Sequence, residues 1–424
     1  MVIHTVKAGE TLRGIAALYG VSPERIISDN ALVYPDSLVT GQALVILIPE
    51  TVHTVGAGQS LSGIAHMYGV SETEILRLNP FLLRRAPLLY AGEQLIISLK
   101  QQKRRELSIN TYVYPFVNRD ILIRELVYLT YLTIFGYGFR TDGSLIEPDD
   151  ADIISLAYTY GAKPVMLLSS VTDDGNFSEK KASELFNNEA LQNEILYKLA
   201  ADMREKGYVG LDIDFEYISP DDEDAFLAFL GKAASVMHDN GFFLNTDLAP
   251  KTSTAQQGLL YEAHNYREVG RISDRVLLMT YEWGYTYGPP MAVAPLKNVR
   301  EVAIYGVSEI SPEKIFLGIP NYGYDWTLPY EKGKTRAVSI GNEQAVNIAR
   351  SYGAEIRFDS DAASPYFEYY DGTQKHIVWF EDARSISGKA TLIDELGIYG
   401  AGYWNGMRPF TQNWALMSAL YNIR

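Results

Sequence analysis

One segment near the start of the chain occurs twice, and this repeat constrains the fold more than any other feature. His4–Ala16, HTVKAGETLRGIA, returns as His53–Ala65, HTVGAGQSLSGIA. Tyr19–Ser22, YGVS, returns as Tyr68–Ser71 at the same offset of 49 residues. Each copy ends in a short apolar run that follows a glycine. A repeat of this length predicts two small units of the same fold in tandem.

The local signals in each copy predict a strand, two helices and a second strand. Gly20 and Gly69 are placed to end the first helix, because glycine adopts the left-handed conformation at a helix C-terminus. Hydroxyl side chains are placed to cap the helix N-termini. These caps are Thr11 and Ser60 for the first helix, and Ser22 and Ser71 for the second.

The repeated pattern resembles the LysM family, which implies two βααβ modules over residues 1–49 and 50–98 that bind N-acetylglucosamine-containing glycans such as peptidoglycan or chitin. In that family the sugar contacts the loop after the first strand and the loop before the second strand. The first of these loops holds Gly9, Glu10, Thr11 and Leu12 in one copy, and Gly58, Gln59, Ser60 and Leu61 in the other. The alternative is that these positions only build the fold. Two short copies favour binding through avidity.

Composition restricts the partners of the larger part of the chain. Residues 1–108 hold 10 Lys and Arg against 9 Asp and Glu, and the remainder holds 27 against 43. An acidic surface disfavours nucleic acid as the partner.

No run of apolar residues is long enough to span a membrane, and the N-terminus has no basic start followed by an apolar run, so we expect no secretory signal. The absence of cysteine excludes disulfides and thiolate metal sites.

The rest of the chain predicts a (β/α)8 barrel. The polar segment within residues 99–108 is expected to be a linker, and from 109 to 424 apolar β-rich runs alternate with helical stretches. The expected strands are 110–116, 131–137, 164–169, 208–216, 242–249, 275–282, 315–322 and 398–405. The longest gap lies between the seventh and eighth strands, where residues 325–380 predict an inserted α+β subdomain. The fold class is therefore multidomain, with two βααβ modules ahead of an α/β TIM barrel.

The fourth expected strand carries a row of three acidic residues: Asp212, Asp214 and Glu216. Alternate residues of a strand share one face, so these side chains point into the barrel while the apolar residues between them face the helices. Burial and mutual repulsion raise carboxyl pKa values, which allows one group to stay protonated as a general acid. Glu216 is nearest the C-terminal mouth, where barrel active sites form. A metal site is an alternative interpretation of such a row.

The same strand resembles the D-G-x-D-x-D-x-E pattern of the family 18 glycoside hydrolases, the chitinase-like group. Val209 stands where that family usually has its first Asp, and we expect this to modulate activity without abolishing it. Further motifs follow in the family's order. They are Thr246–Lys251 at the fifth strand, Met279–Glu282 at the sixth, Gly318–Tyr324 at the seventh and Gly402–Trp404 at the eighth.

This resemblance implies a substrate-assisted, retaining mechanism in which the 2-acetamido group of the sugar is the nucleophile. It implies that Glu216 is the general acid and base, that Asp214 supports the acetamido N–H, and that Asp212 holds Asp214. Tyr281 would donate its hydroxyl to the acetamido carbonyl. Trp404 would form the floor of the sugar site, with Asn321, Tyr322, Glu282 and Asp247 as further candidates for substrate contact. No cofactor and no metal are expected.

Two LysM units before such a barrel resemble a narrower group, the spore-associated N-acetylglucosaminidases of the SleL/YaaH type. This resemblance implies cleavage of cortex peptidoglycan during germination, a location at the spore or cell wall, and action as a monomer. Two alternatives stay open at this point. The first is a chitinase that acts on N-acetylglucosamine homopolymers. The second is a catalytically silent glycan-binding lectin, although intact Asp214 and Glu216 speak against it.

Overall fold

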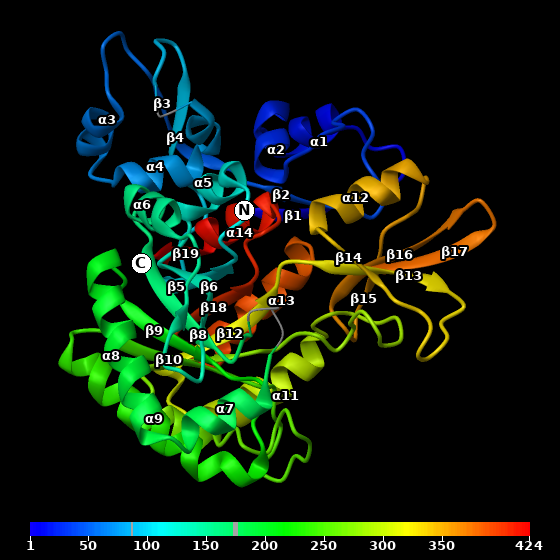
Figure 1. Cartoon of the computed structure of the whole chain (residues 1–424). Coiled ribbons are helices and arrows are strands. Elements are labelled where there is room, and N and C mark those ends of the chain that lie inside the picture. Colours follow the sequence, from blue (N-terminus) through cyan, green and yellow to red (C-terminus); the bar gives the residue numbers. More distant parts are fainter. Residues whose placement is uncertain (86–87, 173–176) are drawn as a thin grey trace.

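The computed structural model describes residues 1–85, 88–172 and 177–424. Two small units in blue and cyan lie at one end of a larger α/β body, and a sheet in yellow and orange extends from its side (Figure 1). Among the described residues, no helix combines the length and the apolar character that crossing a bilayer requires.

Each repeat folds as a separate module with its own two-stranded antiparallel sheet. Module 1 contains β1 (Val2–Thr5), α1 (Leu12–Tyr19), α2 (Pro23–Asn30) and β2 (Ala43–Ile46). Module 2 contains β3 (Pro49–Thr54), α3 (Leu61–Tyr68), α4 (Glu72–Leu78), the 3-10 helix η1 (Pro80–Arg85) and β4 (Gln94–Leu99). The predicted βααβ order is confirmed, while η1 is an addition that the sequence did not predict.

The predicted caps are also confirmed. Thr11 accepts a hydrogen bond from the backbone N–H of Gly14 at 3.1 Å, and Ser60 accepts the equivalent bond from Gly63 at 3.1 Å. Ser22 and Ser71 cap the second helix of each module in the same way. The first helix ends at Gly20 in one module and at Gly69 in the other, with φ values of 66° and 67°. Local sequence therefore determines the helix boundaries in both modules.

Eight parallel strands close into a barrel, and all eight were predicted. They are β5 (Arg105–Val113), β6 (Tyr131–Phe139), β8 (Lys163–Ser169), β9 (Gly210–Asp214), β10 (Phe243–Leu248), β11 (Arg275–Leu278), β12 (Ile315–Pro320) and β18 (Gly400–Trp404). The pairing of β5 with both β6 and β18 closes the ring. The short strands β7 (Leu145–Ile146) and β19 (Tyr421–Ile423) extend the sheet at its edges.

The connection between module 2 and the barrel is shorter than the expected linker over residues 99–108. Strand β4 ends at Leu99 and strand β5 already begins at Arg105. The reason is the C-terminal strand β19, because Tyr421 pairs with Arg105 and extends the first barrel strand toward its N-terminus. The polar composition of this segment gives no sign of that long-range pairing.

Helices surround the barrel. They are α5 (Arg119–Leu126), α6 (Ala151–Thr159), α7 (Glu179–Phe186), α8 (Glu189–Lys206), α9 (Glu223–Asp239), α10 (Tyr266–Ile272), α11 (Leu296–Glu309), α13 (Ala383–Glu395) and α14 (Thr411–Leu420), with the 3-10 turns η2 (Pro220–Asp222) and η3 (Pro312–Lys314). One apolar core lies between strands and helices. A second, aromatic core that includes Tyr112, Tyr131 and Phe316 fills the barrel interior, as expected of a barrel whose centre is packed.

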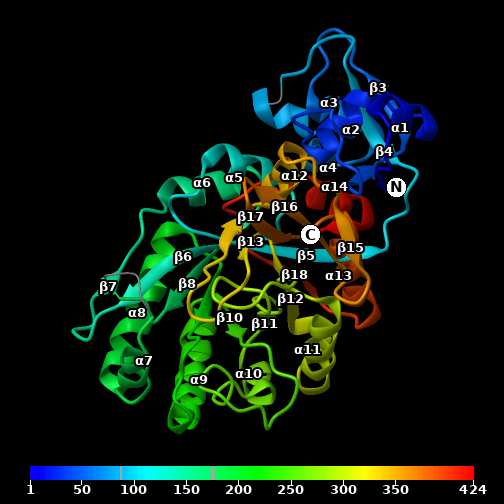
Figure 2. The ribbon, with the colours of Figure 1, turned by 90° about the vertical axis from the view of Figure 1, so that its right-hand side faces the viewer.

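Between β12 and α13 the chain builds a separate antiparallel sheet, called here the insertion (residues 323–380). Its elements are β13 (Gly323–Leu328), β14 (Val338–Ile340), α12 (Asn342–Ser351), β15 (Arg357–Asp359), β16 (Ser364–Asp371) and β17 (Gln374–Trp379). The strand order is β14-β13-β17-β16-β15. Figure 2 shows α12 close to the blue module, with the sheet below it.

Module 2 is hydrogen-bonded to the barrel through Arg77. Its Nε donates to the carbonyl of Val127 at 2.6 Å and its Nη1 to the carbonyl of Ile423 at 3.2 Å. The hydroxyl of Tyr128 donates to the backbone carbonyl of Arg77 at 2.9 Å. These bonds fix one end of α4 against the barrel.

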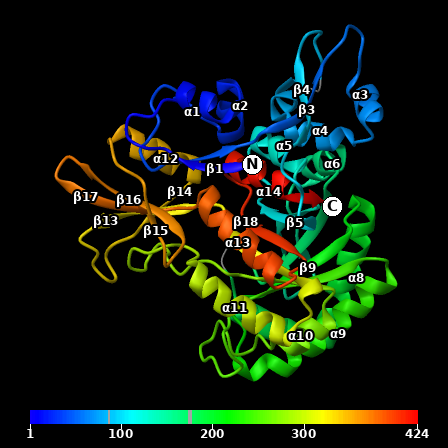
Figure 3. The same cartoon turned by 180° about the vertical axis from the view of Figure 1, so that it is seen from behind.

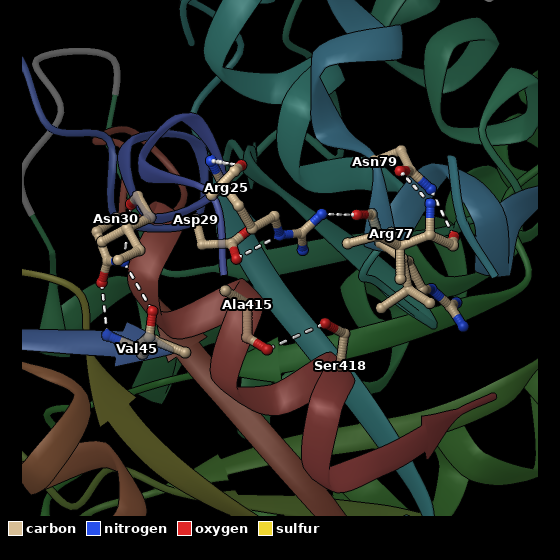
Figure 4. A network of polar contacts seen from close by, with 12 residues as sticks. Arg25, Asp29, Asn30, Val45, Arg77, Asn79, Ala415 and Ser418 are labelled. Atoms are coloured by element: carbon tan, nitrogen blue, oxygen red, sulfur yellow. Dashed lines mark hydrogen bonds and ion pairs between the residues drawn. The ribbon is translucent and has the colours of Figure 1, made fainter. Parts of the chain in front are cut away.

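Module 1 is attached to helix α14 and to module 2. Gln412 of α14 donates to Asn30 at 2.9 Å and to the carbonyl of Ala43 at 2.8 Å. Arg25 pairs with Asp29 and reaches across to the carbonyl of Leu78 in module 2 (Figure 4). Seen from behind, both modules lie on the same end of the molecule as α14 (Figure 3). Modules and barrel are therefore connected by direct contacts as well as by the chain.

Candidate active site

Strand β9 presents its acidic row to the barrel interior, as the alternation predicts. Asp212 and Asp214 are buried, with exposed fractions of 0% and 5%. Leu211, Ile213 and Phe215 belong to the core between strands and helices. Glu216 lies just beyond the end of the strand and is half-buried.

A cavity of about 240 Å³ opens where the acidic row ends. Six predicted residues line it: Asp214, Glu216, Asp247, Tyr281, Glu282 and Trp404. They lie at or just beyond the carboxyl ends of strands β9, β10, β11 and β18, which is where barrel enzymes place their active sites. Pro250, Leu260, Tyr261, Met279 and Trp283 complete the wall. A pocket with apolar walls and a few converging polar groups is typical of a small-molecule or sugar site.

Asp212 lies one layer beneath the cavity and is tied to Asp247 by a tyrosine. The hydroxyl of Tyr112 lies 3.0 Å from Asp212 Oδ2 and 2.8 Å from Asp247 Oδ1. Burial raises the pKa of Asp212 to about 7, against the hydrogen bonds from Tyr112 and Asp247, which lower it. Burial and the charges of Asp212 and Asp214 raise the pKa of Asp247 well above its usual range. We infer that Asp247 holds a proton that is shared within this group.

Asp214 and Glu216 form the part of the row that reaches the cavity. Burial raises the pKa of Asp214, and the neighbouring charges of Glu216 and Asp212 raise it further. Burial also raises the pKa of Glu216, with a smaller contribution from the charge of Glu282. A carboxyl group with a raised pKa at the edge of a cavity can serve as a general acid.

Tyr281 is held in place by its neighbour in the chain. The hydroxyl of Thr280 donates to the carbonyl of Gly318 on β12 at 2.7 Å, which fixes the segment that follows β11. Burial, together with the charges of Asp247, Asp214 and Glu216, raises the pKa of Tyr281 well above its usual range. Its hydroxyl therefore stays protonated and can donate a hydrogen bond to a ligand.

Trp404 closes the cavity from the side of β18. Its ring centre lies 6.0 Å from that of Tyr112, 5.9 Å from Tyr114 and 5.9 Å from Phe135. This aromatic support fixes the indole at the carboxyl end of the strand. A rigid, flat apolar surface of this kind suits the face of a sugar ring.

Glu282 is held by two tyrosines. The hydroxyl of Tyr322 donates to Glu282 Oε1, and that of Tyr324 donates to the same atom at 3.1 Å. Burial raises the pKa of Glu282, while these two donors lower it. The backbone of Glu282 has a φ of 67°, an uncommon conformation for a residue other than glycine. Tyr322 thus reaches the site through Glu282, because it does not line the cavity itself.

Asn321 was a predicted candidate for contact with the substrate, but its side chain bonds to a loop of the protein instead. It is 2% exposed, and its amide donates to the carbonyls of Asn405 at 2.9 Å and Arg408 at 2.8 Å. The side chain thus holds the loop after β18, which follows Trp404. The seventh-strand motif placed Asn321 on the correct strand but could not give the direction of its side chain.

Most of the predicted LysM loop residues brace their own loop. Glu10 accepts hydrogen bonds from His4 at 2.9 Å and from the backbone of Lys7 at 2.7 Å, and Gln59 makes the equivalent bonds in module 2. Thr11 and Ser60 cap helices, and Leu12 and Leu61 are buried. Gly9 and Gly58 are exposed, with φ values of 80° and 79°.

In the described ranges no three carboxylate or imidazole side chains are arranged to ligate one metal ion. Asp212, Asp214 and Glu216 thus do not form such a group among the described residues. Asp212 and Asp247 instead share the hydroxyl of Tyr112 as a hydrogen-bonding partner.

Sequence reasoning missed several residues of the site. Tyr112 lies on the first barrel strand, which was predicted, but nothing in the sequence marked its hydroxyl as the link between two distant aspartates. Tyr261 and Trp283 lie on loops that line the cavity. Aromatic residues that follow a barrel strand were the available signal, and in a chain with 30 Tyr that signal is weak.

Comparison with known proteins identifies both parts of the chain. The model of glycosyl hydrolases family 18 matches residues 126–407, and the LysM domain model matches 4–47 and 53–98. The cortical fragment-lytic enzyme of Bacillus subtilis is 40% identical over 430 residues, which cover 100% of this chain and 99% of that protein. The putative sporulation-specific glycosylase YdhD of B. subtilis is 30% identical, with 100% of both chains covered. The crystal structure of the Bacillus megaterium spore cortex-lytic enzyme SleL has a TM-score of 0.84 and 36% identity, and the match covers 100% of this chain and 98% of that one.

Proposed function

This chain belongs to family 18 of the glycosyl hydrolases and carries two LysM domains, and from that membership we propose that it is a retaining N-acetylglucosaminidase of spore cortex peptidoglycan. The glycosidase activity follows from the family. The substrate is proposed because relatives that match over the whole chain are cortical fragment-lytic enzymes. The proposal includes action as a monomer at the spore cortex.

One observation supports the mechanism above all others. Glu216 is the member of the acidic row that lines the cavity from beyond the strand end, and both burial and Glu282 favour its protonated form. In the first step Glu216 gives its proton to the glycosidic oxygen, and the bond from that oxygen to the sugar's anomeric carbon breaks. The carbonyl oxygen of the 2-acetamido group forms a bond to the anomeric carbon, giving an oxazolinium ion.

Asp214 and Tyr281 act on the acetamido group during this step. Asp214 acts here as a carboxylate that accepts the acetamido N–H. Its surroundings raise its pKa in the empty site, but the bound N–H and the positive charge that develops on the ring favour the ionised form. Tyr281 donates its hydroxyl to the acetamido carbonyl and keeps that oxygen below the anomeric carbon. Trp404 supports the sugar face. Asp212 is held beneath the cavity by its bond to Tyr112, and its charge acts on Asp214.

The second step returns the enzyme to its starting state. The carboxylate of Glu216 takes a proton from a water molecule, and the water oxygen bonds to the anomeric carbon while the oxazolinium ring opens. Two displacements at one carbon leave the configuration retained. The protonated Glu216 is then ready for another cycle.

Product analysis tests the function. Cortex peptidoglycan and chitin are digested in parallel, and the new reducing ends are identified by mass spectrometry. N-acetylglucosamine at the new reducing end of peptidoglycan fragments supports the proposal. Products from chitin alone indicate a chitinase, and the absence of products from both polymers indicates a lectin.

Glu282→Gln is expected to move the alkaline limb of the kcat/KM profile to lower pH. This limb follows the pKa of the general acid, which must be protonated to react. The negative charge of Glu282 contributes to the raised pKa of Glu216, so removing that charge lowers this pKa. The measurement is the pH dependence of cleavage of soluble cortex fragments. A limb that stays in place or moves to higher pH contradicts the assignment of Glu216 as the acid.

A further inference from the structure

The two modules repeat one turn in different surroundings. The turn is Val39–Gln42 in module 1 and Tyr90–Glu93 in module 2. Gln42 N donates to the carbonyl of Val39 at 3.0 Å, and Glu93 N donates to that of Tyr90 at 3.1 Å. The side chain of the fourth residue accepts from the backbone N–H of the first in both, at 3.2 Å and 2.9 Å. The local fold is the same, so the differences described below come from what packs against each turn.

In module 1 this turn packs against the insertion. Val39 is 5% exposed and belongs to the apolar core of the insertion, together with Ile356, Phe367 and Phe380. The backbone N–H of Ile356 donates to the carbonyl of Thr40 at 2.9 Å. A side-chain carbon added at Gly41 would lie 1.7 Å from the carbonyl oxygen of Ile356, so the two backbones are in direct contact.

A cation–π contact holds the same loop from another side. The guanidinium carbon of Arg350, in α12, lies 3.5 Å from the ring centre of Tyr34. The loop before β2 is thus attached to the insertion by apolar, hydrogen-bonded and cation–π contacts.

In module 2 the same turn is exposed. Tyr90, which occupies the position of Val39, is 58% exposed, and the nearby Leu88 is 60% exposed. A side-chain carbon added at Gly92 would meet no atom within 4 Å. Arg85 lies over the ring of Tyr90 at 5.0 Å and pairs with Glu93 at 2.7 Å, so this turn is held from within its own module. An exposed, supported aromatic ring beside an apolar side chain is a surface suited to a sugar ring.

The insertion links module 1 to the catalytic cavity. Strand β13 of the insertion carries Tyr324, which donates to Glu282 at 3.1 Å. Glu282 lines the cavity and contributes to the raised pKa of Glu216. The turn of module 1 packs on the core behind that sheet. Module 1 is therefore placed to support a wall of the active site.

We propose that the two modules have different partners. Module 1 is built into the catalytic unit as a support for the insertion, and module 2 presents the turn around Tyr90 to an N-acetylglucosamine-containing glycan of the wall. This assignment rests on the proposed function, because it takes the wall glycan as the ligand. The repeated sequence pattern alone would suggest that both modules bind glycan in the same way, and this assignment differs from that expectation.

Matched substitutions in the full chain test this assignment. Tyr90→Ala is expected to weaken co-sedimentation with insoluble cortex peptidoglycan about tenfold, because it removes an exposed aromatic contact, and to leave the apparent midpoint of thermal unfolding unchanged. Val39→Ala is expected to lower that midpoint by about 2–6 °C, because it leaves a cavity in a core, and to change the affinity for peptidoglycan less than twofold.

Each outcome has a definite meaning. Equal loss of affinity in the two variants, or full affinity in Tyr90→Ala, overturns the division between the modules. A wild-type chain that does not sediment with peptidoglycan contradicts the proposed wall binding itself, and the assignment of module 2 with it. Product analysis on soluble fragments is independent of both results.

The glycine pair gives a second prediction. Asparagine tolerates a positive φ better than most residues, and the φ values are 83° at Gly41 and 90° at Gly92. Gly41→Asn is expected to lower the midpoint of thermal unfolding by several degrees, because its side chain meets the backbone of Ile356. Gly92→Asn, the matched control, is expected to leave it within about 1–2 °C, since surface changes usually have small effects. Equal midpoints for the two variants would show that the contact with Ile356 contributes nothing.

Discussion

Glu216→Gln is expected to lower kcat on cortex peptidoglycan fragments by about 10²–10⁴-fold, the usual contribution of a general acid and base. Glutamine keeps the shape of the side chain but has no acidic proton to give to the leaving oxygen. Binding to insoluble peptidoglycan is expected to be unchanged, and this serves as the control for folding. Single-turnover and steady-state rates on soluble fragments are the measurements.

The leaving group gives this prediction a sharper form. The phenolate of an aryl glycoside with an acidic phenol leaves without being protonated. The rate of the first step in Glu216→Gln should therefore fall much less on such a substrate than on one whose leaving group is a sugar. The pre-steady-state release of the phenol measures the first step alone. An equal loss on both substrates would mean that Glu216 does not protonate the leaving oxygen.

Asp214→Asn is expected to lower kcat by about 10²–10³-fold, the range found when one group that stabilises transition-state charge is removed. The carboxylate acts on the acetamido nucleophile and on the charge of the ring, while the amide of asparagine is neutral. The loss should therefore persist with the acidic phenol as leaving group. This persistence separates the role of Asp214 from that of Glu216.

The contrast between the two variants is the informative result. If Asp214→Asn keeps more than a tenth of the wild-type rate, the acetamido group does not depend on this carboxylate and substrate assistance through it is wrong. If Asp214→Asn recovers on the aryl substrate as Glu216→Gln does, the two residues share the acid role. The midpoint of thermal unfolding should be measured for both variants, because both positions lie at the end of a packed strand.

Local sequence patterns were sufficient to predict the framework of this fold. Helix caps at Thr11 and Ser60 depend on bonds between residues three positions apart. The direction of Asp212 and Asp214 follows from alternation along one strand. Runs of apolar residues located the eight barrel strands, since a parallel barrel buries both faces of its strands. These features depend on neighbours in the chain and can be found in a single sequence.

The features that were missed depend on residues far apart in the chain. Tyr112 bonds to Asp212 and Asp247, which are 100 and 135 residues away. The side chain of Asn321 could face either the cavity or the loop after β18, and only the position of Asn405 decides between them. The start of β5 at Arg105 depends on the last residues of the chain. No local pattern carries this information.

The surroundings of module 1 also could not be predicted from local sequence, because they depend on distant residues. Val39 and Tyr90 stand at equivalent positions of a repeat, and the sequence suggests that the two copies are used alike. The burial of Val39 depends on Ile356 and Phe380, more than 300 residues later in the chain. Two near-identical units thus have different surroundings because one of them meets the insertion.

The hydrogen bonds of Arg77 and Gln412 hold the modules directly on the barrel. A catalytic domain on a flexible linker could reach many glycosidic bonds while its binding module stayed attached at one point. Because the modules are held directly on the barrel, we expect an anchored molecule to reach only the glycosidic bonds at one fixed distance from its binding point. To cleave further bonds, the enzyme must then dissociate from the polymer and bind again. The rate of dissociation from the wall therefore limits how fast cleavage proceeds along the polymer.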